Sequence, residues 1–187
     1  NINIIALQII NDITKVYYDY VKNEMEVIAK FISEIMKKDN EKIGTQGYMF
    51  WIYLSEEEIA RNLSRKPINN YCQLYITMIW NDIQYTLVRK DAKYDRDNED
   101  EFTRYTASSY LMDNLSKLVD ETFINGIFTF INQCLQTKET SKETIAFYAF
   151  SSILETKLVD KIRAVIPSCI TQLIELLQTN DVQLQLV

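Results

Sequence analysis

The stretch KIRAVIPSCITQLIELLQ, residues 161–178, decides the fold class of this chain. Its apolar residues recur at steps of three and four, the spacing that gathers side chains into one stripe along an α-helix. The members of the stripe are Ile162, Val165, Ile166, Cys169, Ile170, Leu173, Ile174 and Leu177. A helix with so wide an apolar stripe is expected to pack against other helices, because packing removes the stripe from water.

The same periodicity runs through nearly the whole chain. It predicts helices over residues 2–21, 24–37, 41–64, 68–89, 103–118, 121–136, 141–155 and 158–178, with a ninth beginning near Asp181. Only three glycines and two prolines occur in 187 residues, which is too few for the turns of a sheet protein. The predicted connections are short and polar, so neighbouring helices should be antiparallel. The sequence therefore predicts an all-α protein.

Landmarks in the sequence recur with the period of a helical repeat. Ala6-Leu7 and Gln46-Gly47 lie about 41 residues apart, and Ala107-Ser108 and Ala149-Phe150 lie about 42 apart. A period of about 40–47 residues built from helix pairs is typical of HEAT and armadillo repeats. The interval from Gly47 to Ala107 is longer by nearly 20 residues, and the excess coincides with an acidic run. This pattern predicts an α-solenoid of about four HEAT repeats with one insertion.

We expect the chain to be a single segment of such a solenoid. The predicted parts are the second helix of one repeat (1–21), a repeat (24–64), a repeat with an acidic loop at 91–101 (68–118), a repeat (121–155) and a partial repeat (158–187). Asn1 is not an initiator methionine, and the last residues resemble the start of a helix. Both features favour a fragment of a longer protein.

Composition argues against several classes of function. The chain has no histidine, which removes the commonest general base and metal ligand, so neither an enzyme nor a metal or cofactor site is expected. Cys72, Cys134 and Cys169 lack metal-ligand spacing and are interpreted as small apolar residues of a reducing compartment. No apolar run approaches the roughly 20 residues of a membrane span. The net charge of −6 disfavours nucleic acid and anionic membranes, and it favours basic partners.

The acidic run DRDNEDEF, residues 95–102, is the main candidate for function. Its carboxylates create a negative field that attracts segments rich in Lys and Arg, and they can pair with guanidinium groups. The candidates are Asp95, Asp97, Glu99, Asp100 and Glu101. Arg96 and Asn98 dilute the field. The alternative is that the run is only a solvated loop.

Several short motifs occur together, in order, along the chain. They are Ala6-Leu7-Gln8, Tyr17-Tyr18, Gln46-Gly47, Phe50-Trp51, Glu56-Glu57-Glu58, the acidic run ending at Phe102, Ala149-Phe150, Ile153-Leu154-Glu155, Pro167 and Leu173-Ile174-Glu175-Leu176. In this order and spacing they resemble the central HEAT repeats of the importin-β (karyopherin-β) family of nuclear import receptors. The resemblance covers the whole chain, which would be about four repeats of a receptor with about nineteen.

This resemblance implies a transport receptor that shuttles between cytoplasm and nucleus through the nuclear pore. Its partners would be the importin-α adaptor or basic cargo, Ran-GTP and FG-nucleoporins, and the receptor would be monomeric. In the family, second helices line a concave surface that binds basic ligands, and grooves between first helices accept phenylalanine rings. Transportin-like receptors have a much longer acidic loop, so the short loop here favours importin-β.

The resemblance also assigns roles to individual residues. Phe102 takes the place of a family tryptophan that stacks on a ligand, or else it anchors the next helix. Glu56 matches an acidic position of the concave face, whereas Glu57 and Glu58 are interpreted as exposed helical acids. Ile28, Phe31 and Ile32 would form one wall of a groove for FG-nucleoporins whose other wall precedes Asn1, unless they are ordinary core residues.

Two other classes of function remain as alternatives. A HEAT scaffold that holds enzyme subunits together, like that of protein phosphatase, would have near-uniform repeats of about 39 residues without a long acidic insertion. An enzyme with carboxylate or metal chemistry is disfavoured, because no helix carries a spaced pair of acidic ligands.

Overall fold

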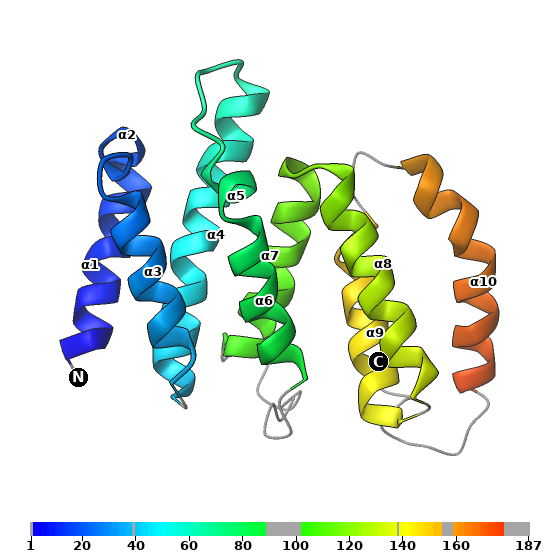
Figure 1. Cartoon of the computed structure of the whole chain (residues 1–187). Helices are drawn as coiled ribbons and strands as arrows, with labels where there is room; N and C mark the ends of the chain where they lie inside the picture. The colour runs from blue at the N-terminus through cyan, green and yellow to red at the C-terminus, as the bar shows by residue number, and fades with distance from the viewer. Residues whose placement is uncertain (1, 39, 89–101, 138, 155–158, 178–187) are drawn as a thin grey trace. The chain divides into compact units, whose positions relative to one another are not determined.

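The computed structural model describes residues 2–38, 40–88, 102–137, 139–154 and 159–177. These residues form two compact units, Asn1–Val119 and Asp120–Val187. All of the regular structure in the described residues is helical (Figure 1). The all-α prediction is therefore confirmed.

The first unit contains seven helices in the residues that the structure describes. They are α1 (Ile2–Val16), α2 (Tyr18–Val21), α3 (Met25–Met36), α4 (Glu41–Leu63), α5 (Tyr71–Leu74), α6 (Ile76–Leu87) and α7 (Arg104–Leu118). Helix α3 packs on α4 and α6 packs on α7, which gives the expected helix pairs. The second helices α1, α4 and α7 contact one another in series, and the first helices α3 and α6 also meet.

Helix α4 lies at the centre of this unit and contacts α1, α3, α5 and α7. A helix covered on several sides is apolar nearly all round, and α4 has the fully buried side chains of Tyr48, Phe50, Trp51 and Leu54. The Trp51 ring meets Phe50 edge-on at a centroid distance of 5.0 Å. Trp51 is therefore a core residue of the first unit.

Side-chain caps begin α4 and α7, where the sequence changes from polar to periodic. Asn40 Oδ1 accepts a hydrogen bond from the Ile43 N–H at 3.0 Å at the start of α4. Thr103 Oγ1 accepts the Thr106 N–H at 3.1 Å at the start of α7. Such caps satisfy backbone donors that have no partner within the helix.

Two predicted helices are each interrupted once. The helix expected over 2–21 breaks at Tyr17, which separates α1 from α2. The helix expected over 68–89 begins only at Tyr71, because Asn70 has a left-handed backbone with φ of 54°, and it breaks at Tyr75. A residue in that conformation cannot continue a right-handed helix.

The second unit contains α8 (Glu121–Gln136), α9 (Thr140–Ser151) and α10 (Val159–Leu177) within its described residues. Helices α8 and α9 pack on each other, and Ile124, Ile127 and Ala149 are fully buried. The amphipathic stretch at residues 161–177 lies within α10, as predicted. Its stripe is only partly covered, since Ile162 is buried whereas Ile170 and Ile174 are half exposed.

Candidate protein-binding groove and acidic surfaces

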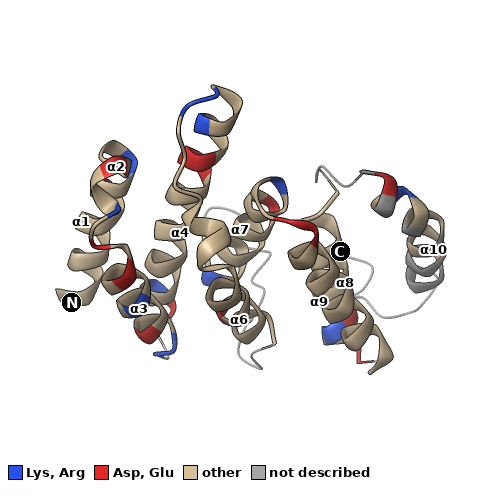
Figure 2. Ribbon diagram, turned by 45° about the horizontal axis from the view of Figure 1, so that its top comes forward, with Lys and Arg blue, Asp and Glu red and all other residues tan. Residues whose placement is uncertain are grey.

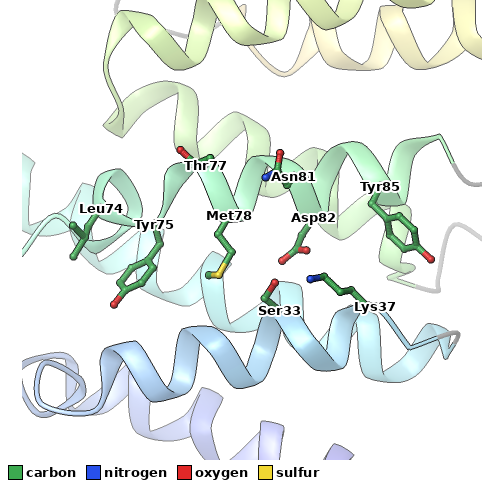
Figure 3. A pocket seen from close by; sticks show the side chains of 9 residues that line it. All are labelled: Ser33, Lys37, Leu74, Tyr75, Thr77, Met78, Asn81, Asp82 and Tyr85. Carbon is green, nitrogen blue, oxygen red and sulfur yellow. The ribbon is translucent and has the colours of Figure 1, made fainter.

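A groove of about 720 Å³ lies in the first unit between the two first helices α3 and α6. Figure 3 shows Met78 and Asp82 pointing from α6 toward Ser33 and Lys37 on the α3 side. Leu74, Tyr75 and Met78 form an apolar end. The rest of the lining is polar: Ser33, Lys37, Thr77, Asn81, Asp82 and Tyr85. The groove can therefore receive an apolar side chain next to a hydrogen-bonding group.

The apolar end of the groove is accessible to solvent, and its Tyr75 side chain packs on the core. Leu74 is 70% exposed, and Tyr75 and Met78 are half-buried. The Tyr75 ring lies 6.0 Å from the buried Trp51 ring, so the helix break at Tyr75 places this side chain between the core and the groove. An aromatic ring entering here would meet both aromatic and thioether surface, to which aromatic rings bind well.

The polar end is built around Asp82, which is 6% exposed. Its carboxylate shares a hydrogen bond with Ser33 and faces the positive charges of Lys37 and Arg104. Burial raises the pKa of this carboxyl, whereas the Ser33 hydrogen bond and the two cations act to lower it. Its Oδ2 atom is buried and has no hydrogen-bond partner in the described part of the chain.

Arg104 supports the polar end from inside the core, where it is 2% exposed. It donates from Nη2 to the carbonyl of Met36 at the C-terminus of α3. The side chain crosses Gly44 so closely that a Cβ there would lie 2.4 Å from Arg104 Cδ. The Arg104 backbone N–H donates to Glu41 Oε1. Arg104 thus joins the start of α7 to the α3–α4 turn.

The predicted acidic candidates Asp95, Asp97, Glu99, Asp100 and Glu101 lie outside the described residues. Phe102, which follows them, is described and is 47% exposed. It directly precedes the Thr103 cap of α7. Its exposed ring is available for contact with a partner, and its assigned role stays a prediction.

The three glutamates at the end of α4 have three different environments. Glu56 is exposed and accepts a hydrogen bond from the Tyr110 hydroxyl of α7 at 2.9 Å. Glu57 pairs with Arg61 at 2.7 Å. The interpretation of Glu58 as an exposed acid is wrong, because its side chain is fully buried.

Glu58 holds together segments that are distant in sequence. Its Oε1 atom accepts the Tyr71 N–H at 2.6 Å and the Tyr18 hydroxyl at 3.1 Å, and its Oε2 atom accepts the Cys72 N–H at 3.3 Å. Burial is the largest cause of the raised pKa of this carboxyl. Glu58 is therefore a structural acceptor in the core.

The predicted wall residues of α3 lie away from the observed groove. Two residues along a helix correspond to a rotation of about 200°, so Phe31 points to the opposite side of α3 from the groove residue Ser33. Ile28 and Phe31 are half-buried, whereas Ile32 is fully buried. Because Ile32 is buried, it cannot form part of an exposed wall, and that part of the prediction is wrong. Ile28 and Phe31 remain candidates for the wall of a second groove.

Sequence reasoning missed the groove between α3 and α6, although one signal was present. Asp82 lies among Ile79, Ile83 and Leu87 on the buried face of its helix. An ionisable residue on an apolar face is unusual and could have marked this position.

Charge and composition of the described residues add further observations. Acidic and basic residues are interspersed over the helices (Figure 2). No group of His, Cys, Asp and Glu in the described ranges could hold a metal ion. Among the same residues, no helix has the length and apolar content for crossing a membrane. Cys72 and Cys134 are buried, and Cys169 is half-buried.

Comparison with known proteins identifies what this chain resembles. No protein-family profile matches it. It is 22% identical over 185 residues to importin subunit beta-1 of Arabidopsis thaliana, with 94% of this chain and 21% of the relative covered. It is 24% identical over 152 residues to importin subunit beta-1 of Schizosaccharomyces pombe, with 76% of this chain and 18% of the relative covered. The chain thus spans about a fifth of the length of these relatives.

Solved structures of importin-β share its fold. A crystal structure of importin-β superposes with a TM-score of 0.82 at 20% identity, covering 96% of this chain and 22% of the other. A structure in which Kap95p binding induces the switch loops of RanGDP to adopt the GTP-bound conformation gives 0.81 at 18% identity, with the same two coverages. A Kap95:Nup1 complex also gives 0.81 at 18% identity, covering 96% and 21%. The chain resembles importin-β in sequence and has its HEAT-repeat fold, as predicted.

Proposed function

We propose that the chain is the central part of an importin-β-type nuclear transport receptor, and that the groove between α3 and α6 binds FG-nucleoporins. The single observation that carries this proposal is the apolar end of the groove, formed by Leu74, Tyr75 and Met78 between successive first helices. Supporting it, the chain shares the fold of Kap95, which has been solved in complex with Nup1. The protein would act by binding, in the cytoplasm, the nucleus and the nuclear pore.

The chemistry of the groove suits a phenylalanine side chain. Burying an aromatic ring against Tyr75 and Met78 removes apolar area from water, which stabilises a complex by about 25 cal/mol for each Å². A single ring in an open groove gives weak binding, and several grooves acting on one flexible peptide give avidity. Ile28 and Phe31 would belong to a second groove on the other side of α3.

Basic partners would bind the acidic surfaces. Carboxylates at Asp95, Asp97, Glu99, Asp100 and Glu101, together with Glu56 on the second helices, would attract an arginine-rich segment of importin-α or of cargo. Phe102 would add a ring that a cationic side chain can stack on. The net charge of −6 supports this assignment. Ran-GTP is a further proposed partner, supported by the shared fold with Kap95p, which has been solved with Ran.

The groove is tested with a fluorescently labelled peptide that carries Phe-Gly in a neutral, Ser- and Asn-rich sequence. Met78→Ala should weaken binding about three- to tenfold, because it removes apolar contact from the apolar end of the groove. Val27→Ala is the matched control, since Val27 lies on α3, is 67% exposed and does not line the groove. Anisotropy titrations in which Met78→Ala binds as tightly as wild type would remove the groove from the proposal.

A further inference from the structure

The polar end of the groove contains an acceptor that the fold leaves unused. Asp82 is 94% buried, and one of its two carboxylate oxygens already bonds to Ser33. The other, Oδ2, has no partner among the described residues. A buried carboxylate oxygen without a donor costs free energy, so native structures usually supply one.

We propose that Asp82 is the polar anchor of this groove and accepts a hydrogen bond from a neutral N–H or O–H group of the bound peptide. This inference rests on the proposed function of the groove and assigns a specific acceptor to it. Asp82 and Met78 both line the groove, and Figure 3 shows their side chains pointing to the same side of α6, toward α3. The peptide is thereby held by an apolar contact at Met78 and by a hydrogen bond at Asp82.

The charges around Asp82 select a neutral donor over a cationic one. Lys37 and Arg104 already place two positive charges near the carboxylate. A Lys or Arg side chain of a ligand would add a third cation beside a single anion, and the like charges would repel one another. A backbone amide or a Ser, Thr or Asn side chain gains the hydrogen bond without that repulsion. The groove therefore discriminates against basic peptides.

The spacing between the two anchor points fits an extended peptide. Met78 and Asp82 are four residues apart, which is about one helical turn of 5.4 Å. An extended chain advances about 3.3 Å per residue. A phenylalanine over Met78 therefore places a backbone N–H one or two residues away from it at the Asp82 carboxylate.

Lys37 controls access to this acceptor. Its side chain is exposed and points toward the Asp82 carboxylate from the C-terminal cap of α3 (Figure 3). A long, exposed side chain can turn into solvent at small cost, which opens Oδ2 to the peptide. Removal of this side chain is expected to leave binding equal or tighter.

The test combines a protein variant with peptides that lack one N–H group. Asp82→Asn keeps the size of the side chain and replaces one acceptor with a donor. It should weaken binding of the neutral Phe-Gly peptide about tenfold, as expected for a hydrogen bond to a charged group. Glu34→Gln removes one carboxylate charge from α3 outside the groove lining and should bind like wild type. Thermal unfolding checks that both variants are folded.

Peptides methylated on successive backbone nitrogens near the phenylalanine then locate the donor. One methylated peptide should bind wild type about tenfold more weakly than the unmethylated peptide does. The same two peptides should bind Asp82→Asn with equal affinity, because the hydrogen bond is already lost in that variant. Equal affinity of Asp82→Asn and wild type, or equal losses for every methylated peptide on both proteins, would overturn the anchor while leaving the Met78 result intact. Absence of any wild-type binding would instead overturn the proposed function, and the anchor with it.

Discussion

Gly44→Ala should destabilise the first unit, because of one close approach. An added Cβ would lie 2.4, 2.6 and 2.9 Å from Cδ, Nε and Cζ of Arg104, all shorter than ordinary contact. Overpacking of this kind costs about 1–3 kcal/mol, and a displaced charged hydrogen bond to Met36 costs about 1.5–3 kcal/mol. Alanine regains about 1 kcal/mol of helix propensity. With both costs and the propensity gain taken together, the expected net loss in the free energy of unfolding is about 1.5–5 kcal/mol.

Urea unfolding followed by tryptophan fluorescence measures this loss. Both tryptophans, Trp51 and Trp80, lie in the first unit, so the signal reports the unit that contains Gly44. The same substitution is then made in an Arg104→Ala protein. With the arginine gone, Gly44→Ala should be neutral or stabilising by up to about 1 kcal/mol.

Gly47→Ala is the matched control within the same helix. Its Cβ would meet the Met36 side chain, with Cγ at 2.6 Å, whereas Arg104 bonds the Met36 carbonyl. Its cost should therefore change much less between the two backgrounds than the cost of Gly44→Ala. If Gly44→Ala costs as much in the Arg104→Ala protein as in wild type, the buried guanidinium is not the cause and the reasoning fails.

Two further predictions concern charge. Burial raises the pKa of Glu58 above its ordinary 4.5, so the folded state binds this proton more tightly than the unfolded chain does. The unfolding free energy of wild type minus that of Glu58→Gln should therefore rise as the pH falls from neutral toward 4.5. Urea titrations that give a constant or falling difference would contradict this prediction. Neutralising the acidic run at Asp95, Asp97, Glu99, Asp100 and Glu101 should weaken binding to an arginine-rich peptide and reduce the salt dependence of that binding. As a control, removal of two exposed charges on α3, Glu26 and Glu34, should change neither quantity. If the affinity and its salt dependence are unchanged by neutralising the run, the acidic run does not take part in binding.

The helices could be predicted because their signal is local. Apolar periodicity and polar caps such as Asn40 depend on neighbouring residues, so the extents of α3, α4, α7 and α8 follow the expected ranges closely. The breaks at Tyr17 and Tyr75 could not be predicted from periodicity, which continues across both. Asn70 adopts a left-handed backbone, a conformation that Asn tolerates better than most residues, but the apolar periodicity gives no sign of it.

The candidate site depended on contacts between segments that are far apart in sequence. Glu58 looks like one member of an acidic triplet, and its three donors lie 13, 14 and 40 residues away. Prediction of the groove would have required knowing which faces of α3 and α6 meet, and the apolar pattern of a single helix does not give this. The same holds for Ile32, whose side chain faces Gly47 of α4.

The hydrogen bonds of Glu58 make one side of the first unit stiffer than the other. One carboxylate ties α2, α4 and α5 together, and these helices come from three successive pairs. Sliding one pair past the next at this edge would require breaking charged hydrogen bonds in the core. The α3–α6 side has a groove, and the carboxylate on that side, Asp82, has a hydrogen bond to Ser33 where Glu58 has three. Elastic bending of this unit should therefore occur by widening or narrowing the groove, so that a peptide wedged there also sets the local curvature.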